Sequence, residues 1–286
     1  MSISAADVKK LRDQTGAGMM DCKSALEEAK GNFEDATTIL RKKGLASAAK
    51  KAGRATSEGL IGHRLSSDAS TGTLVEVNCE SDFVARTDDF QQLMKDVLDA
   101  IDKAGSAATP EWLKDPAGPV QQRLAATIGK LGENMAVPRF VRYSGQGYVG
   151  QYIHLGGKLG VQIEFGGVTP AVHTREEFKT LVKEMAMQVA AASPGYLMRS
   201  AVPADALDKE KAIYRAQMEN SGKPANVIDK IVEGKLGSYY SQVVLPDQPS
   251  IRDPKMTVAQ VLAAAATELG APVTVTRFAR LKVGEA

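Results

Sequence analysis

The sequence predicts an α+β protein: an N-terminal three-helix bundle, then a duplicated α+β core of antiparallel strands and packed helices that carries an inserted helical hairpin. Three observations lead to this prediction. Glycines separate three short apolar-periodic stretches within the first 55 residues. Residues 88–97 reappear in kind at 176–185, an offset of 88. Apolar stripes at helical spacing flank a Gly- and Pro-containing turn between about 204 and 245.

These patterns divide the chain into three predicted units. The bundle and a basic linker occupy residues 1–55, the first core repeat 56–143, and the second repeat 144–286. The helical hairpin interrupts the second repeat, and a helix and a strand follow it. A chain of 286 residues is long enough for two or three modules with sizeable cores.

The bundle is predicted to contain three helices that end at glycines. The first covers Ala5–Thr15, with Ser4 as N-cap and Gly16 as the stop. The second runs from Met19 to about Ala29, and the third carries an apolar stripe from Phe33 and ends near Gly44. The expected core is aliphatic and consists of Ala25, Leu26, Ile39 and Leu40.

Two adjacent methionines lie at the glycine-rich connection between the first two helices. Met19 and Met20 cannot both face inward, because neighbouring helical residues point about 100° apart. Met packs well in cores, but it also makes adaptable contact surfaces. The sequence leaves both roles open for this pair.

The N-terminal region is basic, although the whole chain has a net charge of only +2. Residues 1–56 hold eleven Lys and Arg against seven Asp and Glu. Within them, 41–54 contains six cations and no acid: Arg41, Lys42, Lys43, Lys50, Lys51 and Arg54. Such a stretch could bind nucleic acid, but no aromatic residue lies among the cations to stack on bases. We therefore favour a mobile, solvated linker.

The first core repeat contains a corner between a strand and a helix. Leu74, Val75 and Val77 read as a buried strand that turns at Asn78, and Ser81 or Asp82 can cap the following helix. This places Asp82 beside Phe83 where two rigid elements meet, a position suited to insertion into a partner. Alternatively, Phe83 packs beneath the first helical turn, since Phe is usually buried.

The duplication bears on this corner. Phe90, Leu93 and Lys95 recur as Phe178, Leu181 and Lys183, and the preceding strand recurs in pattern with a slightly different offset. Between strand and helix the copies diverge, with residues 81–86 in the first and 166–170 in the second. A corner that served only the scaffold would be needed in both copies. The divergence therefore indicates function.

The remaining elements follow from the same rules. Residues 116–119 interrupt the helical pattern and precede a helix with an apolar stripe of Leu124, Ile128 and Leu131. A strand is expected over 135–143, and a hairpin over 151–154 and 159–165, turned by Gly156 and Gly157. A helix ends near Ser193-Pro194.

The inserted hairpin has two predicted arms. Leu207, Tyr214 and Met218 stripe the first arm, and residues 221–224 make the turn. The second arm is striped by Ile228, Val232, Leu236, Tyr239 and Val243. This stripe is most simply the seam between the arms, with self-association as the alternative. Pro246, Pro249 and Pro254 end the hairpin before a helix from Val258 and a strand over 273–279.

Composition excludes several classes of protein. Cys22 and Cys79 lie in different units without a CxxC pair, which argues against a disulfide scaffold or a zinc site. No apolar run reaches membrane-spanning length, and the first residues lack a signal-peptide core. We expect a cytoplasmic protein with no membrane partner.

The sequence offers no catalytic grouping. His63, His154 and His173 have no carboxylate or Cys partner at a telling spacing. The glycine pairs at 145–147 and 156–157 lack the Lys and the strand–loop–helix context of a phosphate loop. We therefore expect no catalytic residue, metal or cofactor. From the residues alone, His154 is interpreted as a histidine at the end of a strand whose ring nitrogens are hydrogen-bonded.

Two long motifs resemble one known family. Residues 15–26, TGAGMMDCKSAL, are similar to the N-terminal signature of the elongation factor Ts family, and residues 76–85, EVNCESDFVA, resemble its second signature. The likeness extends to residues 221–224 and 231–235, and so covers essentially the whole chain. Two such motifs in order are far more specific than a short pattern.

The resemblance implies a fold, a partner and a mechanism. The bundle would be UBA-like, and the partner would be elongation factor Tu, whose bound GDP the protein would release without acting as an enzyme. Phe83 would wedge beside the partner's Mg²⁺ site, and the residues implied at this loop are Asp82, Phe83, Val84, Ala85 and Arg86. The bundle would dock through Arg12, Met19, Met20 and Lys23. His154 would contact a distal domain of the partner. A homodimer or 2:2 assembly stays open.

Two positions depart from the family pattern. Ser81 stands where Thr is usual, which keeps the capping hydroxyl. Ser250 and Arg252 lie where the family often has a more apolar run, which puts a hydrophobic contact from residues 248–252 in doubt.

Two alternatives remain at this point. An RNA-binding protein using the basic linker predicts steep salt dependence and tolerance of Phe83→Ala. A UBA-like scaffold without exchange activity predicts partner binding with unchanged nucleotide release. We expect no direct nucleic-acid contact.

Overall fold

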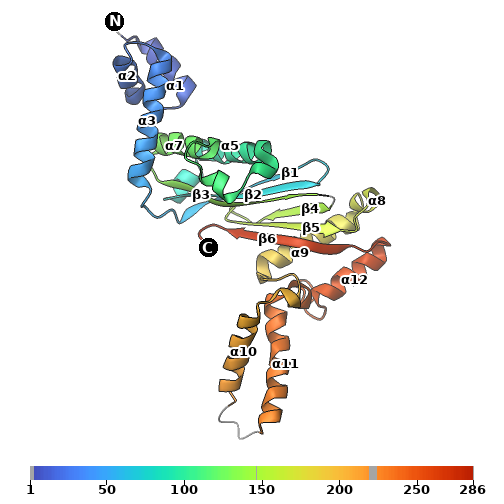
Figure 1. Cartoon of the computed structure of the whole chain (residues 1–286). Helices are drawn as coiled ribbons and strands as arrows, with labels where there is room; N and C mark the ends of the chain where they lie inside the picture. The colour runs from blue at the N-terminus through green and yellow to red at the C-terminus, as the bar shows by residue number, and fades with distance from the viewer. Residues whose placement is uncertain (1–2, 146, 219–223, 286) are drawn as a thin grey trace.

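The N-terminal bundle consists of α1 (Ala5–Thr15), α2 (Met19–Glu28) and α3 (Phe33–Lys51). The computed structural model of the chain describes residues 3–145, 147–218 and 224–285 (Figure 1). Ser4 caps α1 in a reciprocal capping box with Asp7, and Gly16 ends it in the left-handed conformation. The buried core of the bundle comprises Val8, Leu11, Cys22, Ala25, Leu26 and Ala36. The expected core residues Ile39 and Leu40 are only partly buried against it.

The third helix is longer than predicted. α3 runs to Lys51 instead of ending near Gly44. Gly44 lies against α7 (Pro119–Leu131), where a Cβ would be 3.3 Å from the carbonyl oxygen of Ala125. The glycine therefore permits close helix packing and does not terminate the helix. Most of the basic stretch is consequently helical, and the prediction of a linker after Gly44 was wrong.

The core consists of two antiparallel sheets. Within the described residues, β1 (Glu58–Leu65), β2 (Thr71–Cys79) and β3 (Met135–Ser144) form one three-stranded sheet with β2 central. The second sheet contains β4 (Tyr148–Ile153), β5 (Leu159–Gly166) and β6 (Thr274–Lys282), with β5 central. The predicted strands over 135–143 and 159–165 are confirmed, and the last strand begins one residue later and runs three residues further than expected.

The two sheets pack against each other between layers of helices (Figure 1). α5 (Asp88–Ala104) and α7 cover the outer face of the first sheet. α9 (Glu176–Ala192), with α12 (Val258–Leu269) beside it, covers the second sheet. Leu74, Val75 and Val77 of the central strand are fully buried, as their apolar run predicts.

The duplication is more regular than the sequence indicated, because the offset of 88 also holds in the strands. Gly62 lies beneath Met94 of α5, and Gly150 lies beneath Val182 of α9 in the same way. A side chain at either glycine would collide with the covering helix. The expectation of a different offset in the strands was therefore wrong.

Backbone hydrogen bonds join the two repeats reciprocally. The N–H of Ile61 donates to the carbonyl of Gly157 at 2.7 Å, and the N–H of Val149 donates to the carbonyl of Ala69 at 2.7 Å. These donors and acceptors are equivalent under the offset of 88. The core is therefore a pair of related units within one chain.

Shorter elements connect these layers. α4 (Asp82–Ala85) and α8 (Pro170–His173) each join a central strand to a long helix, and α6 (Pro110–Lys114), which the sequence did not predict, precedes α7. Three 3₁₀ turns cover Gly105–Ala107, Arg199–Ala201 and Leu245–Asp247.

The helical hairpin projects from the second sheet (Figure 1). Its arms are α10 (Ala204–Ala216) and α11 (Ala225–Val243). Val232 and Leu236 of the predicted seam are buried, and Tyr214 of the first arm is half-buried. The turn predicted at 221–224 lies, except for Pro224, outside the described residues.

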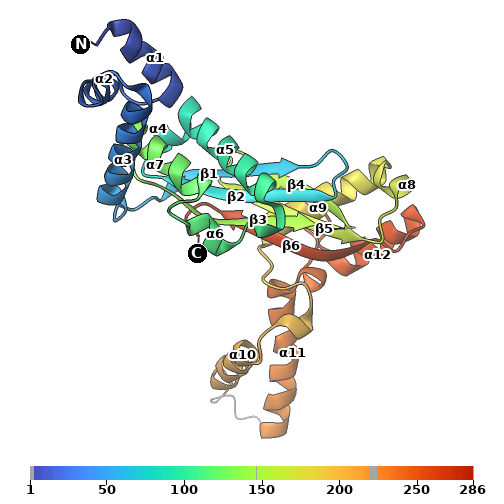
Figure 2. The same cartoon turned by 45° about the horizontal axis from the view of Figure 1, so that its top comes forward.

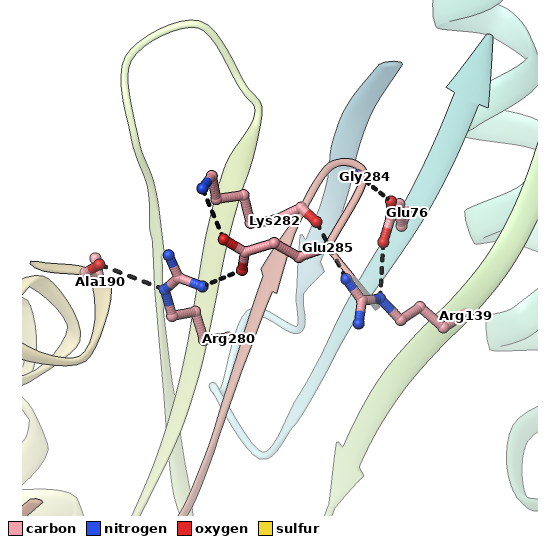
Figure 3. A network of polar contacts seen from close by, with 7 residues as sticks. All are labelled: Glu76, Arg139, Ala190, Arg280, Lys282, Gly284 and Glu285. Carbon is pink, nitrogen blue, oxygen red and sulfur yellow. Dashed lines mark hydrogen bonds and ion pairs between the residues drawn. The ribbon is translucent and has the colours of Figure 1, made fainter. Parts of the chain in front are cut away.

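The C-terminal residues close over the junction of the two sheets (Figure 3). Glu76 on β2 accepts hydrogen bonds from the Arg139 guanidinium at 2.7 Å and from the N–H of Gly284 at 2.9 Å. Arg139 also donates to the carbonyl of Lys282 at 3.1 Å. Glu285 in turn accepts from Arg280 and Lys282. The buried carboxylate of Glu76 thus ties the first sheet to the end of the chain.

Candidate functional site

The corner after β2 presents Phe83 to solvent. Ser81 is the N-cap of α4, and its hydroxyl accepts from the N–H of Val84 at 3.4 Å. Phe83 is 78% exposed, so the alternative that it packs beneath the helix is wrong. Asp82 beside it forms an ion pair with Arg86 at 2.7 Å. The arrangement holds a large apolar side chain outward beside the Asp82–Arg86 ion pair.

The backbone of this corner is anchored from inside. Ala85 is buried and Val84 packs against the first core. The hydroxyl of Thr87 then caps α5 by accepting from the N–H of Phe90 at 3.3 Å. Because Phe90 is fully buried, the helix after the corner is fixed in the core. Phe83 therefore projects from a short helix between two anchored elements.

A buried thiol supports the corner from below. The Sγ of Cys79 donates to the carbonyl of Ser81 at 3.1 Å. Burial raises the pKa of Cys79, and the nearby carboxylates of Glu133 and Glu58 raise it as well, so that together they bring it to about 12. The thiol is therefore protonated and can act as this donor at neutral pH.

The second repeat contains the same corner, contrary to expectation. Thr169 caps α8, and its hydroxyl accepts from the N–H of Val172 at 3.4 Å, as Ser81 does for α4. The sequences looked different because Pro170 and Ala171 occupy the positions of Asp82 and Phe83. The corner itself is therefore part of the duplicated scaffold. The first copy differs in carrying an exposed aromatic side chain.

The expected contact residues of the bundle are all exposed. Met19 and Met20 are 52% and 72% exposed, so neither belongs to the core. Lys23 lies one turn further along α2, 3.8 Å from Glu27, and Arg12 lies on α1. All four side chains are therefore accessible to a partner. Figure 2 shows α4 at the end of the core that carries the bundle.

His154 lies at the turn between β4 and β5. It follows the last residue of β4 and is exposed, and its Nδ1 is 2.9 Å from the hydroxyl of Tyr152. The next residue, Leu155, is 95% exposed. Leu155 was not predicted as a contact residue, although the Gly156-Gly157 turn that follows marks it as a hairpin tip. The tip therefore presents an imidazole and an apolar side chain together.

The loop that departs from the family pattern is well anchored. The side chain of Gln188, 1% exposed, donates to the carbonyl of Pro249 and accepts from the N–H of Ile251 at 2.8 Å. Ser250 is buried, whereas Ile251 is 43% exposed. Arg252 pairs with Glu184. One apolar side chain thus remains available on this loop.

A cleft of about 640 Å³ lies between the bundle and α7, beside the point where α3 packs on α7. Gly18, Asp21 and Arg41 line its bundle side, and Arg123 and Lys130 line its α7 side. Arg123 and Lys130 are paired with Asp96 and Asp89 at 2.5 and 2.6 Å. The cleft holds no nucleophile and base in contact, and it marks the seam between bundle and core.

The described part of the chain contains no group of three or more His, Cys, Asp or Glu side chains placed to hold a metal ion. The two cysteines are free and buried. Among the helices described, none combines the length and apolar character required to cross a membrane.

Comparison with known proteins gives a consistent result. A sequence model of the family described as elongation factor TS matches residues 80–285. The chain is 45% identical over its full length to elongation factor Ts of Trichlorobacter lovleyi, covering 94% of that protein. It is 41% identical to elongation factor Ts of Aquifex aeolicus, with 99% of each chain covered. It is 42% identical to that of Clostridium acetobutylicum over 99% of this chain and 93% of the relative.

Proposed function

The chain belongs to the elongation factor Ts family, and we propose from this that it binds elongation factor Tu carrying GDP and promotes release of the nucleotide. GTP then reloads the emptied site. An exchange factor accelerates release only if it binds the nucleotide-free state more tightly than the loaded state. Its surface must therefore make contacts that the loaded partner cannot accept.

The observation that carries this proposal is the exposure of Phe83 on a fixed corner. A large apolar side chain that is 78% exposed gains free energy when a partner buries it. We propose that Phe83 inserts beside the Mg²⁺ site of elongation factor Tu. Asp82 and the backbone of Val84, Ala85 and Arg86 would disturb the groups that position the cation. Without Mg²⁺ the phosphate charges of GDP are uncovered, and GDP binds more weakly.

Remote contacts supply the binding energy for this opening. We propose that Arg12, Met19, Met20 and Lys23 dock the bundle on the GTPase domain. His154, with the exposed Leu155 beside it, would anchor a distal domain of the partner. Contacts at both ends would offset the cost of distorting the nucleotide site. No covalent bond forms or breaks, so the protein acts by binding and not as an enzyme.

Three further assignments belong to the proposal. The bundle (1–55) and the repeats (56–143 and 144–286) act as separate contact modules in the cytoplasm. The helical hairpin, with Ile213 49% and Val227 38% exposed, is the surface by which a homodimer or 2:2 assembly would form. The partner is a protein, with no direct nucleic-acid contact.

Release of fluorescent GDP from elongation factor Tu, chased with excess unlabelled GDP, tests the proposal. We expect the wild type to accelerate release and Phe83→Ala to lower the maximal rate on the order of tenfold, with binding retained. Leu65→Ala, which truncates another partly exposed apolar residue, is the matched control and should behave as the wild type.

The other outcomes separate the alternatives. Without acceleration by folded wild-type protein, the exchange function is wrong, and salt-dependent RNA binding becomes the next measurement. Equal acceleration by wild type and Phe83→Ala keeps the function and removes Phe83 as its agent.

A further inference from the structure

A carboxylate from a distant part of the chain holds the Phe83 corner. Both the N–H and the hydroxyl of Ser81 donate to Glu133, at 3.0 and 2.6 Å. Glu133 follows the end of α7, 52 residues away in sequence. Hydrogen bonds to an ionised carboxylate are stronger than those between neutral groups. The N-cap of α4 is therefore fixed by a residue that belongs to neither adjoining element.

A second set of contacts ties this brace to the helix of the bundle. The N–H of Asn134 donates to the Glu80 carboxylate at 2.5 Å, and its side-chain amide donates to the carbonyl of Arg54 at 2.7 Å. The Arg54 guanidinium is 3.4 Å from the same Glu80 carboxylate. Arg54 lies three residues beyond the end of α3. The corner, the turn after α7 and the end of α3 thus form one connected cluster.

The equivalent corner of the second repeat lacks this brace. Thr169 caps α8 as Ser81 caps α4, but among the described residues no carboxylate accepts a hydrogen bond from Thr169. Both corners connect a strand to a long helix, so the scaffold does not require the carboxylate. The brace accompanies the exposed Phe83 and is absent where Ala171 takes its place.

A four-residue helix needs such support if it is to carry a wedge. A single helical turn is marginal by itself, because nucleation fixes several dihedrals for one hydrogen bond. A flexible Phe83 would have to lose conformational freedom on insertion, and that loss would weaken the contact. A corner fixed beforehand avoids this cost.

We propose that Glu133 is a positioning residue that fixes the Phe83 corner in the conformation able to insert, with Asn134 and Arg54 linking the corner to the bundle. This inference rests on the proposed exchange function and on the wedge role of Phe83. It predicts that Glu133 affects nucleotide release only through Phe83.

A double-mutant cycle tests that dependence. The maximal rate of GDP release from elongation factor Tu is measured with wild type, Glu133→Ala, Phe83→Ala and the double variant. We expect Glu133→Ala to lower the rate about tenfold and to have no further effect when Phe83 is already Ala. Independent losses that multiply in the double variant, or no loss from Glu133→Ala, would overturn the inference while the exchange function stands.

Two further variants separate positioning from general destabilisation. Glu133→Gln keeps one acceptor oxygen and should restore part of the rate. Thr169→Ala removes the equivalent cap in the second repeat and should leave the maximal rate unchanged. A loss with Thr169→Ala equal to that with Glu133→Ala would contradict a specific role for Glu133.

Amide hydrogen exchange on the free protein gives a readout that needs no partner. We expect Glu133→Ala to speed exchange about tenfold at the hydrogen-bonded amides of Val84 and Ala85, and to leave the equivalent amides of Val172 and His173 unchanged. Unchanged exchange in the first helix, or faster exchange in both, would overturn the brace. The exchange measurement tests the role of Glu133 even if the wild type fails to accelerate GDP release from elongation factor Tu. The positioning role of Glu133 and the exchange function can therefore fail separately.

Discussion

Single glutamates show how equivalent residues serve the two repeats. Glu76 and Glu164 occupy matching positions on the central strands, and each accepts hydrogen bonds from an arginine on the neighbouring strand, Arg139 or Arg277. Their remaining bonds differ. Glu76 accepts a hydrogen bond from the N–H of Gly284, whereas Glu164 accepts one from the hydroxyl of Thr276 at 2.8 Å. The same carboxylate thus closes the junction of the sheets in one repeat and stays within its own sheet in the other.

The pKa of Glu164 predicts a pH-dependent contribution to stability. Burial acts to raise this pKa, but the hydrogen bonds from Arg277 and Thr276 outweigh burial, and the pKa is lowered. Folding therefore favours the ionised form. The contribution is complete above the unfolded-state value of about 4.3 and is lost as the pH falls through the folded-state pKa.

We expect Glu164→Gln to lower the free energy of unfolding by about 1.5 kcal/mol at neutral pH, discounted because Arg277 is partly exposed. The difference from wild type should shrink as the pH falls below the unfolded-state value and the wild-type carboxyl becomes protonated. Urea unfolding at several pH values measures both. Glu268→Gln, which changes an exposed carboxylate without an ion-pair partner among the described residues, is the matched control.

At the scale of elements, the crossing of α3 over α7 determines where the bundle lies. A Cβ on Gly129 would be 3.5 Å from the Cα of Gly44, so these two backbones pack almost directly on each other. Lys130, next to Gly129, also links core and bundle, since it pairs with Asp89 of α5 at 2.6 Å and lies near Gly16 of the bundle. A single helix that packs in both bundle and core transmits the orientation of one to the other.

A larger side chain at this crossing should misplace the bundle without unfolding it. We expect Gly129→Leu to separate α3 from α7 and to raise the concentration for half-maximal GDP release about tenfold. The melting temperature of the core should change little. Gly234→Leu, at an exposed position on α11 with open space around it, is the matched control. An unchanged half-maximal concentration for Gly129→Leu would show that the crossing does not orient the bundle.

At the scale of the whole molecule, the two repeats are joined by reciprocal bonds and by the C-terminal segment. The N–H of Val283 donates to the carbonyl of Lys158 at 2.9 Å, and Gly284 reaches Glu76 on the other sheet. Val283 also packs in the small apolar cluster between the sheets. The sheets therefore share contacts that neither could make alone.

A chain ending at Lys282 should lose these contacts. We expect the free energy of unfolding to fall by about 2 kcal/mol, because Glu76 loses a hydrogen-bond donor and Val283 its packing. Chemical denaturation measures the change, and removal of Ala286 alone is the control. Equal stability of the two truncated chains would contradict a joining role for the C-terminal segment.

Local patterns in the sequence determined several helix boundaries, the amphipathic helices and the family. Ser4 and Gly16 delimit the first helix, because capping and termination depend on only a few neighbouring residues. The amphipathic helices from Asp88 and Glu176 follow from a period of 3.6 residues. The two long motifs sufficed for the family, and local chemistry narrowed the cap after the first central strand to Ser81 or Asp82, of which the structure uses Ser81.

Only the tertiary structure decided exposure and packing between distant residues. The sequence could not show that Phe83 faces solvent or that both Met19 and Met20 do, because burial depends on which elements cover a side chain. The sequence pattern predicted that α3 ends near Gly44, whereas Gly44 packs against α7 and the helix runs on to Lys51. The contact of Ser81 with Glu133 joins residues far apart in the chain, and such a contact leaves no periodic pattern in one sequence.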